Sequence, residues 1–199
     1  MNRNSIRLAL ALGLSVSGCA SPDPDFYTLQ MTDGVTALRK GQLIEVRRPG
    51  LAGYLDRSDI VLKNANYRLN VNSQVRWSEP LGDMIGRVLT EDLAQRLPGS
   101  SVFSESGAIS ADADMRVEVN VQLFDSRADG QVTLVAQVAV EPGLGHHPVV
   151  TRHVALSAMP AGPGATQLVA TMSDLLGRLA DDIAANVQRG GASLQADPG

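Results

Sequence analysis

Two long stretches of the chain alternate apolar and polar residues with a period of two. The apolar residues of the first stretch are Tyr67, Leu69, Val71, Val75 and Trp77. Those of the second stretch are Met115, Val117, Val119, Val121 and Leu123. Because successive side chains of a strand point to opposite faces of its sheet, each stretch predicts a long strand with one buried and one solvated face.

Shorter patterns predict the neighbours of these two strands. Asp129-Gly130 is typical of a hairpin turn, so the alternating apolar residues of 132–140 are expected on the partner strand. Further strands are predicted at residues 43–47, 60–63 and 149–158, with connecting turns at 64–66 and 143–148.

Two other segments have the period of an amphipathic helix. The first apolar stripe consists of Leu81, Ile85, Val88, Leu89, Leu93 and Leu97. Ser78 is predicted as its N-cap, with Glu79 and Pro80 in the first turn, and Pro98-Gly99 as its end. The second stripe consists of Leu168, Met172, Leu175, Leu176, Leu179, Ile183 and Val187. Gly190-Gly191 is expected to end the second helix.

These patterns predict an α+β fold with two layers. A mainly antiparallel sheet forms one layer, and two amphipathic helices pack on its apolar face. Residues 26–189 are expected to form a single domain, and residues 190–199 a flexible tail. The other face of the sheet is polar enough to meet water or a partner, including a second copy in a homo-oligomer.

The start of the chain has the layout of a signal peptide. Arg3 and Arg7 precede an uncharged apolar run at 8–16, and two small residues then precede Cys19. The run is shorter than the roughly 20 residues that span a bilayer. A chance cysteine after an ordinary signal peptide and a buried N-terminal helix are the alternative interpretations.

Cys19, the single cysteine, follows a segment that resembles the lipobox of bacterial lipoproteins, Val-Ser-Gly-Cys. That resemblance implies cleavage after residue 18 and acylation of the thiol by palmitate-type chains. Ala20 follows, whereas an aspartate there commonly signals inner-membrane retention, so the outer membrane is favoured. Residues 19–25 then form a lipidated tether, of which the polar part reaches about 20 Å.

Charge argues against nucleic acid as a partner. The formal net charge is −4, and it becomes −6 when Arg3 and Arg7 leave with the signal peptide. Neutralisation of phosphates supplies most of the affinity for nucleic acid, and an acidic domain without a basic cluster cannot provide it.

No catalytic constellation stands out in the sequence. His146, His147 and His153 fall in or beside one predicted turn, which favours a polar hairpin tip over a metal site. Residues 162–164 lack the lysine of a phosphate-binding loop. Asp181-Asp182 suit a solvated helix face better than an acid/base pair. We therefore predict a protein that is not an enzyme, with no metal and no cofactor beyond the lipid on Cys19.

Residues 54–57, Tyr-Leu-Asp-Arg, lie between two predicted strands and allow two interpretations. In one, Tyr54 and Leu55 pack on the end of the sheet while Asp56 and Arg57 pair with each other. In the other, the four residues form a contact loop for another protein. The sequence leaves both open.

Several ordered motifs resemble the ABC-type transport auxiliary lipoproteins of the PqiC type. They are Phe-Tyr-Thr-Leu at 26–29, Tyr-Leu-Asp-Arg at 54–57, Ile-Val at 60–61 and Arg-Trp-Ser-Glu-Pro-Leu at 76–81. The resemblance is specific as far as Leu97. Residues 47–53 depart from it, because they are longer and richer in glycine than the family pattern.

The resemblance implies a periplasm-facing lipoprotein that works with an MCE-type protein and ABC transporter subunits in moving lipids or other apolar molecules. It implies no nucleotide site in this subunit. Tyr54, Leu55, Asp56 and Arg57 are the expected partner contacts, and Trp77 is assigned to the core. A lipoprotein of another envelope machine, such as a secretion or outer-membrane assembly complex, and a stand-alone lipid carrier remain alternatives.

The lipid anchor gives the first testable prediction. Each buried methylene of an acyl chain contributes about 0.8 kcal/mol to membrane binding, so a chain without its lipids should detach. Cys19→Ser is expected to move the protein from the membrane to the soluble fraction when cell fractions are blotted. Retention of the variant in the membrane would contradict lipidation at Cys19.

Overall fold

The computed structural model describes residues 23–36, 41–63, 68–109, 111–143 and 151–195. Its elements are, in chain order, β1 (Asp25–Tyr27), β2 (Leu43–Val46), β3 (Gly50–Leu51), β4 (Asp59–Lys63), β5 (Leu69–Trp77), α1 (Leu81–Arg96), β6 (Ser101–Ser104), β7 (Met115–Ser126), β8 (Val132–Pro142), β9 (Thr151–Ala158) and α2 (Ala165–Gln195). The predicted α+β class is confirmed. The signal peptide, Cys19 and the start of the tether lie outside the described residues and remain predictions.

The sheet is mixed, with β7 at its centre. The long ladders, β7 with β8 and β8 with β9, are antiparallel as predicted. On its other edge β7 receives the shorter strands β2, β3 and β4 in turn, and all three pair with it in parallel. The prediction of a mainly antiparallel sheet therefore describes the long ladders but omits these parallel pairings. Short parallel strands carry too few residues for a period to appear in the sequence.

The alternation along β7 breaks near its end. Met115, Val117, Val119 and Val121 are buried as predicted, but Leu123 is only half-buried and Phe124 occupies the core instead. The pairing register with β8 shifts between residues 121 and 123. One extra residue in a strand moves every later side chain to the opposite face, which explains the error in the prediction.

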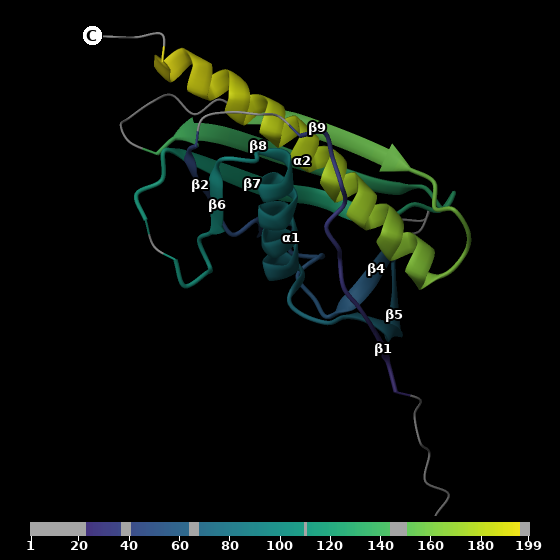
Figure 1. Cartoon of the computed structure of the whole chain (residues 1–199). Coiled ribbons are helices and arrows are strands. Elements are labelled where there is room, and N and C mark those ends of the chain that lie inside the picture. The colour runs from purple at the N-terminus through teal and green to yellow at the C-terminus, as the bar shows by residue number, and fades with distance from the viewer. Residues whose placement is uncertain (1–22, 37–40, 64–67, 110, 144–150, 196–199) are drawn as a thin grey trace, which may run out of the picture.

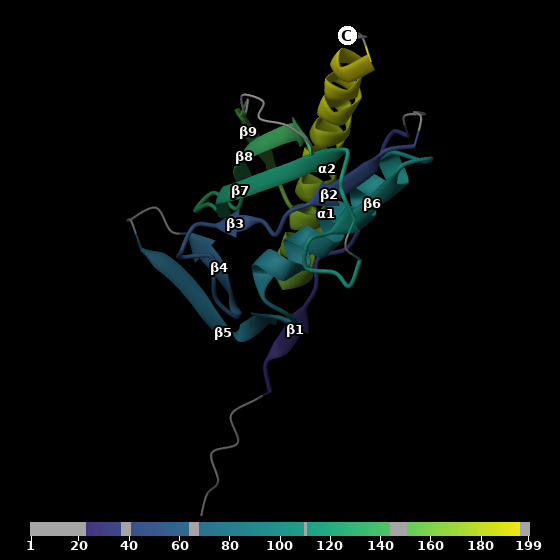
Figure 2. The same ribbon diagram turned by 90° about the vertical axis from the view of Figure 1, so that its left-hand side faces the viewer.

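The hairpin of β4 and β5 diverges from the body of the molecule, as Figure 2 shows. Within the sheet, β4 pairs with β7 at one position only among the described residues, Leu62 opposite Ser126. At the outer end of β5, Leu69 is 44% exposed, so the predicted buried face does not extend along the whole strand. At the inner end, Trp77 is buried in the core, as predicted.

Both helical stripes are buried in full, and both helices lie over one side of the sheet (Figure 1). α2 packs across β8 and β9, while α1 packs on α2, β6 and β2. Among the described residues, neither helix combines the length and the apolar composition that crossing a membrane requires.

The predicted helix ends need two corrections. The N-cap of α1 is Pro80, not Ser78, and no side chain caps the helix. The Ser78 backbone N–H instead donates to the Tyr27 carbonyl at 2.9 Å, which extends the pairing of β1 with β5. α2 continues past Gly190-Gly191 to Gln195, because two glycines weaken a helix without forcing it to end.

An extended segment, residues 28–34, crosses both helices and is called the strap here (Figure 1). Side chains of the helices hold its backbone. The Thr32 N–H donates to the Asp92 carboxylate at 2.9 Å, and Gly34 exchanges two hydrogen bonds with the Gln95 amide. From α2, the Ser173 hydroxyl accepts from the backbone N–H of Gln30 at 3.1 Å. The strap therefore fastens the N-terminal end of the domain to both helices.

A buried arginine lies beneath the strap. Arg96 is 1% exposed and donates to the Thr32 carbonyl at 2.8 Å, to Asp92 at 3.2 Å and to Asp181 at 2.6 Å. Burial raises the pKa of Asp92 to about 6, although its hydrogen bonds from Thr32 and Arg96 act in the opposite direction. The prediction placed Asp181 on a solvated helix face. It missed that one carboxylate oxygen of Asp181 also accepts a hydrogen bond from the buried Arg96 and compensates its charge.

Close packing under the strap generates a stability prediction. A Cβ on Gly177 in α2 would overlap the Thr32 hydroxyl and lie 3.2 Å from the Arg96 guanidinium. Gly177→Ala should therefore lower the free energy of unfolding by about 1–3 kcal/mol. Alanine alone would favour a helix by about 1 kcal/mol, so the sign of the effect is diagnostic. Urea unfolding measures it.

Gly53→Ala is the matched control, because no atom lies within 4 Å of a Cβ placed there. It is expected to leave the free energy of unfolding within about 0.5 kcal/mol of that of the parent. A stabilised Gly177→Ala variant would mean that the strap does not pack against α2 as described.

Candidate partner-binding site

The predicted contact residues lie in a compact loop between β3 and β4, residues 52–58, called the Tyr54 loop here. Backbone bonds from Leu55 to Ala52 at 2.8 Å and from Arg57 to Leu55 at 2.9 Å fold it tightly. Leu55 is 2% exposed and belongs to the core. The loop is therefore fixed to the domain from within.

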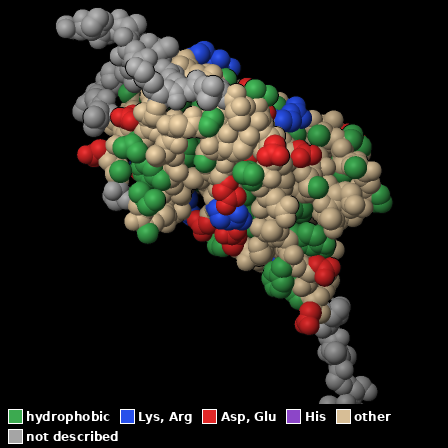
Figure 3. Space-filling view, in the orientation of Figure 1, with side chains coloured by type: hydrophobic (Ala, Val, Ile, Leu, Met, Phe, Trp, Pro, Cys, Tyr) green, Lys and Arg blue, Asp and Glu red, His purple; other side chains and the backbone are tan. Residues whose placement is uncertain are grey.

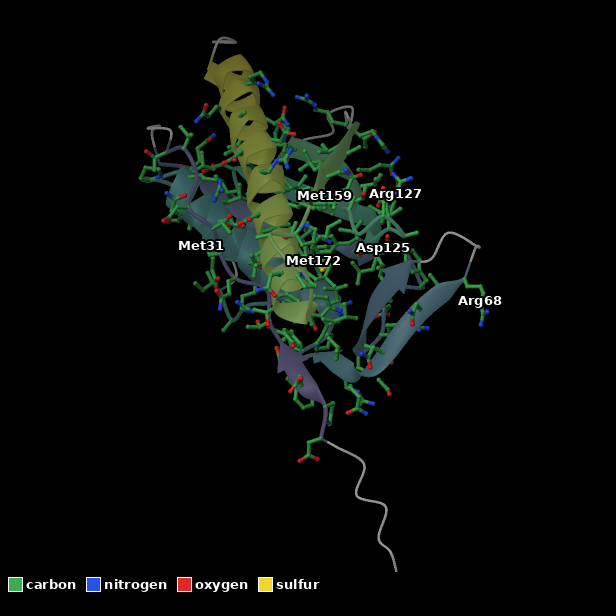
Figure 4. The ribbon with its side chains drawn as sticks, turned by 90° about the vertical axis from the view of Figure 1, so that its right-hand side faces the viewer. Met31, Arg68, Asp125, Arg127, Met159 and Met172 are labelled. Atoms are coloured by element: carbon green, nitrogen blue, oxygen red, sulfur yellow. The ribbon has the colours of Figure 1, made fainter. Side chains whose placement is uncertain are left out.

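Tyr54 provides the second attachment of the loop. Its hydroxyl donates to the Asp125 carboxylate at 2.8 Å, and Asp125 is fully buried at the end of β7. Burial, followed by this hydrogen bond, raises the pKa of Tyr54 well above its ordinary value, so the phenol stays protonated and continues to donate. Figure 4 shows Asp125 at the end of the sheet that faces the wing formed by β4 and β5.

Asp56 and Arg57, in contrast, are exposed. Among the described residues they form no ion pair with each other. The structure thus supports the packing of Tyr54 and Leu55 from the first interpretation, but not the local pair of Asp56 with Arg57. Whether the four residues contact a partner remains a prediction.

The fold brings the Tyr54 loop against a second motif of the sequence analysis. The backbone N–H of Trp77 donates to the Ser58 carbonyl at 2.7 Å. This bond joins the loop to the start of the segment before α1. Between them lies a groove of about 360 Å³, called the Trp77 groove here. Its lining residues are Asp56, Arg57, Ser58, Trp77, Glu79 and Pro80.

Sequence reasoning singled out the two motifs separately but did not predict that they meet. Trp77 was assigned to the core alone, and it is 4% exposed, yet it also lines this groove. The only sequence signal was that both motifs belong to the same family resemblance.

Ion pairs surround the groove. Glu79 accepts from Arg87 at 2.7 Å, and Arg76 lies 3.3 Å from Asp59. The hydrogen bond that Arg87 donates to Glu79 is the main reason that the pKa of Arg87 is raised. On the face in Figure 3, basic side chains are few and are scattered among acidic and apolar ones.

The other predicted chemical features do not converge on a site. His153 is exposed on β9, while His146 and His147 lie outside the described residues. No cluster of His, Cys, Asp and Glu that could hold a metal ion occurs in the part of the chain that the structure describes. Gly162 and Gly164 line an apolar cleft of about 360 Å³ between the wing and the start of α2.

Residues 27–184 match the sequence model of a protein family described as the ABC-type transport auxiliary lipoprotein component. The chain belongs to this family. The match includes the strap, the Tyr54 loop, the Trp77 groove and most of α2, so it extends well beyond the N-terminal half in which the motifs were specific. The resemblance seen in the sequence is confirmed.

Two solved structures are similar to this auxiliary lipoprotein in fold. The crystal structure of an uncharacterized protein has a TM-score of 0.70 at 18% identity, covering 83% of this chain and 99% of the other. The crystal structure of XCC0632 from Xanthomonas campestris, of the family DUF330, has a TM-score of 0.72 at 13% identity, covering 87% and 99%. No curated protein sequence matches the chain. At these identities the similarity shows the fold alone.

Attachment of the Tyr54 loop can be tested through one hydroxyl. Tyr54→Phe leaves the buried Asp125 without its phenolic donor, and it should lower the free energy of unfolding by about 1–3 kcal/mol. Tyr27→Phe is the matched control, because this half-buried hydroxyl makes no hydrogen bond within the described part of the chain. Equal denaturation midpoints for the two variants would show that the bond to Asp125 does not hold the loop.

Proposed function

We propose that this auxiliary lipoprotein is a lipid-anchored, non-enzymatic subunit of an ABC-type transport system on the periplasmic side of the envelope. It works with an MCE-type protein and with ABC transporter subunits, and the system moves lipids or other apolar molecules between the inner and outer membranes. The family match over residues 27–184 is the observation that carries the proposal.

The position of the groove relative to the anchor supports a docking role. Ser78 lies between the groove residues Trp77 and Glu79 in the chain, and it is bonded to Tyr27 of β1, which begins at Asp25. Cys19 lies six residues before Asp25, a distance of about 20 Å when extended. An acylated Cys19 would hold the Tyr54 loop close to the membrane, where the end of a transport assembly arrives.

The construction of the site suits binding rather than chemistry. Leu55 and Tyr54 fix the loop from below, which leaves Asp56 and Arg57 displayed on a rigid support. Such preorganised loops lower the entropy that is lost on association. We assign no catalytic residue, metal or cofactor to the subunit, and the covalent lipid on Cys19 is its only attached group.

Gentle purification of the lipidated protein from its own membranes tests this function. Mass spectrometry of the bound material should detect an MCE-type protein and ABC subunits, at levels well above those with an unrelated lipoprotein as bait. Recovery of a secretion or assembly complex instead would overturn the proposal. Lipid that accompanies the purified domain in the absence of transport subunits would favour a stand-alone carrier.

A further inference from the structure

We propose that the Trp77 groove binds an acidic side chain on an extended segment of the protein partner. The inference rests on the proposed function for the identity of that partner. It adds the chemistry of recognition, namely which groups of this chain meet a carboxylate and which form the surface beneath the segment.

The first observation is an indole N–H without an acceptor. Trp77 is 4% exposed, so its ring is almost completely buried. Its side-chain nitrogen donates no hydrogen bond to any of the described residues, yet it is not among the buried polar atoms that lack a partner. The N–H is therefore not fully enclosed, and Trp77 is one of the residues that line the groove. Buried indoles usually find an acceptor, and here a ligand can supply it.

The second observation is an excess of donors beside that N–H. Arg57 is exposed and has no carboxylate within 4 Å among the described residues, and the Ser58 hydroxyl also makes no bond there. Arg57 alone carries five N–H donors. Together with Trp77, these side chains present donors around one space, and none of the three carries a negative charge.

One of the two acidic residues of the groove is held in an ion pair. Glu79 is bonded to Arg87 at 2.7 and 3.2 Å. Arg48 is bonded to Asp83 at 2.6 Å, which is the main reason that the pKa of its guanidinium is raised, and Asp56 adds a smaller electrostatic contribution. Because Arg57 has no carboxylate partner among the described residues, its charge remains for a ligand, and an anion complements it.

An extended protein segment fits the remaining features better than a free anion. Pro80 and the Trp77 ring give the groove an apolar surface, and about 360 Å³ accommodates more than a single carboxylate. The acidic side chain would bind Arg57 and the indole N–H, while a neighbouring apolar group would cover Pro80. Charge-assisted hydrogen bonds of this kind are short and about twice as strong as neutral ones.

Charge reversal at Arg57 tests the inference in the lipidated protein. Arg57→Glu should reduce recovery of the transport subunits at least tenfold in the purification described above, whereas Arg57→Lys should retain part of it. Arg68→Glu is the matched control. Arg68 is likewise exposed, but it precedes β5 at the end remote from Trp77, about 30 Å away along an extended strand (Figure 4).

Trp77 provides an independent readout, because the chain contains one tryptophan. With 5-fluorotryptophan incorporated, its fluorine-19 signal should move or broaden when the purified transport subunits are added to the wild-type protein. The Arg57→Glu variant should leave the signal unchanged at the same concentrations, and its melting temperature should equal that of the parent.

Two outcomes would overturn the inference while leaving the proposed function intact. One is equal recovery of the transport subunits with Arg57→Glu and with the wild type. The other is an equal loss with Arg57→Glu and Arg68→Glu, which would indicate a general charge effect. Failure of the wild-type protein to recover any transport subunit would instead contradict the proposed function.

Discussion

The buried ion pair of Arg96 with Asp92 is the interaction on which the rest of the structure depends. Both side chains are almost completely enclosed, and each also bonds the strap, Arg96 at the Thr32 carbonyl and Asp92 at the Thr32 N–H. Removing either partner would leave an uncompensated charge in the interior, which typically costs about 3–5 kcal/mol. If the strap left the helices, this ion pair would therefore lose its hydrogen bonds to Thr32 and become exposed to water. A tether attached to the strap is fastened to the core itself, which suits the N-terminal membrane anchor that we propose.

The sequence was most informative where one element carries its own period. The apolar stripes of α1 and α2, the β7–β8 hairpin and the burial of Trp77 all follow from side chains a few positions apart, and each was predicted correctly. These features depend on local geometry, which repeats every two residues in a strand and about every 3.6 in a helix. Long elements provide enough repeats for such a period to be recognised.

What the sequence did not indicate depends on contacts between distant segments. β3 is two residues long and β1 three, so neither has a period to detect, and both exist because β7 and β5 offer free edges. The bulge in β7 has no signature among its apolar residues. Ser78 has the composition of an N-cap, but its N–H is taken by Tyr27 across the sheet. In the candidate site, the Tyr54 motif and the Trp77 motif were both visible, whereas their meeting depends on pairing between β4 and β5.

The bulge also explains why the Tyr54 loop can be rigid. If the alternation of Met115 to Val121 continued unchanged, Asp125 would point into the core beneath the helices. The register shift gives that inward position to Phe124, and Asp125 pairs with Thr133 on the opposite face. There the Tyr54 hydroxyl covers it and the loop is fixed in place. Because the same loop ends at Ser58, whose carbonyl holds the Trp77 backbone, the irregularity in β7 also determines where Arg57 stands relative to the indole. The donors that we assign to a partner's carboxylate are thus positioned by a single extra residue in the central strand.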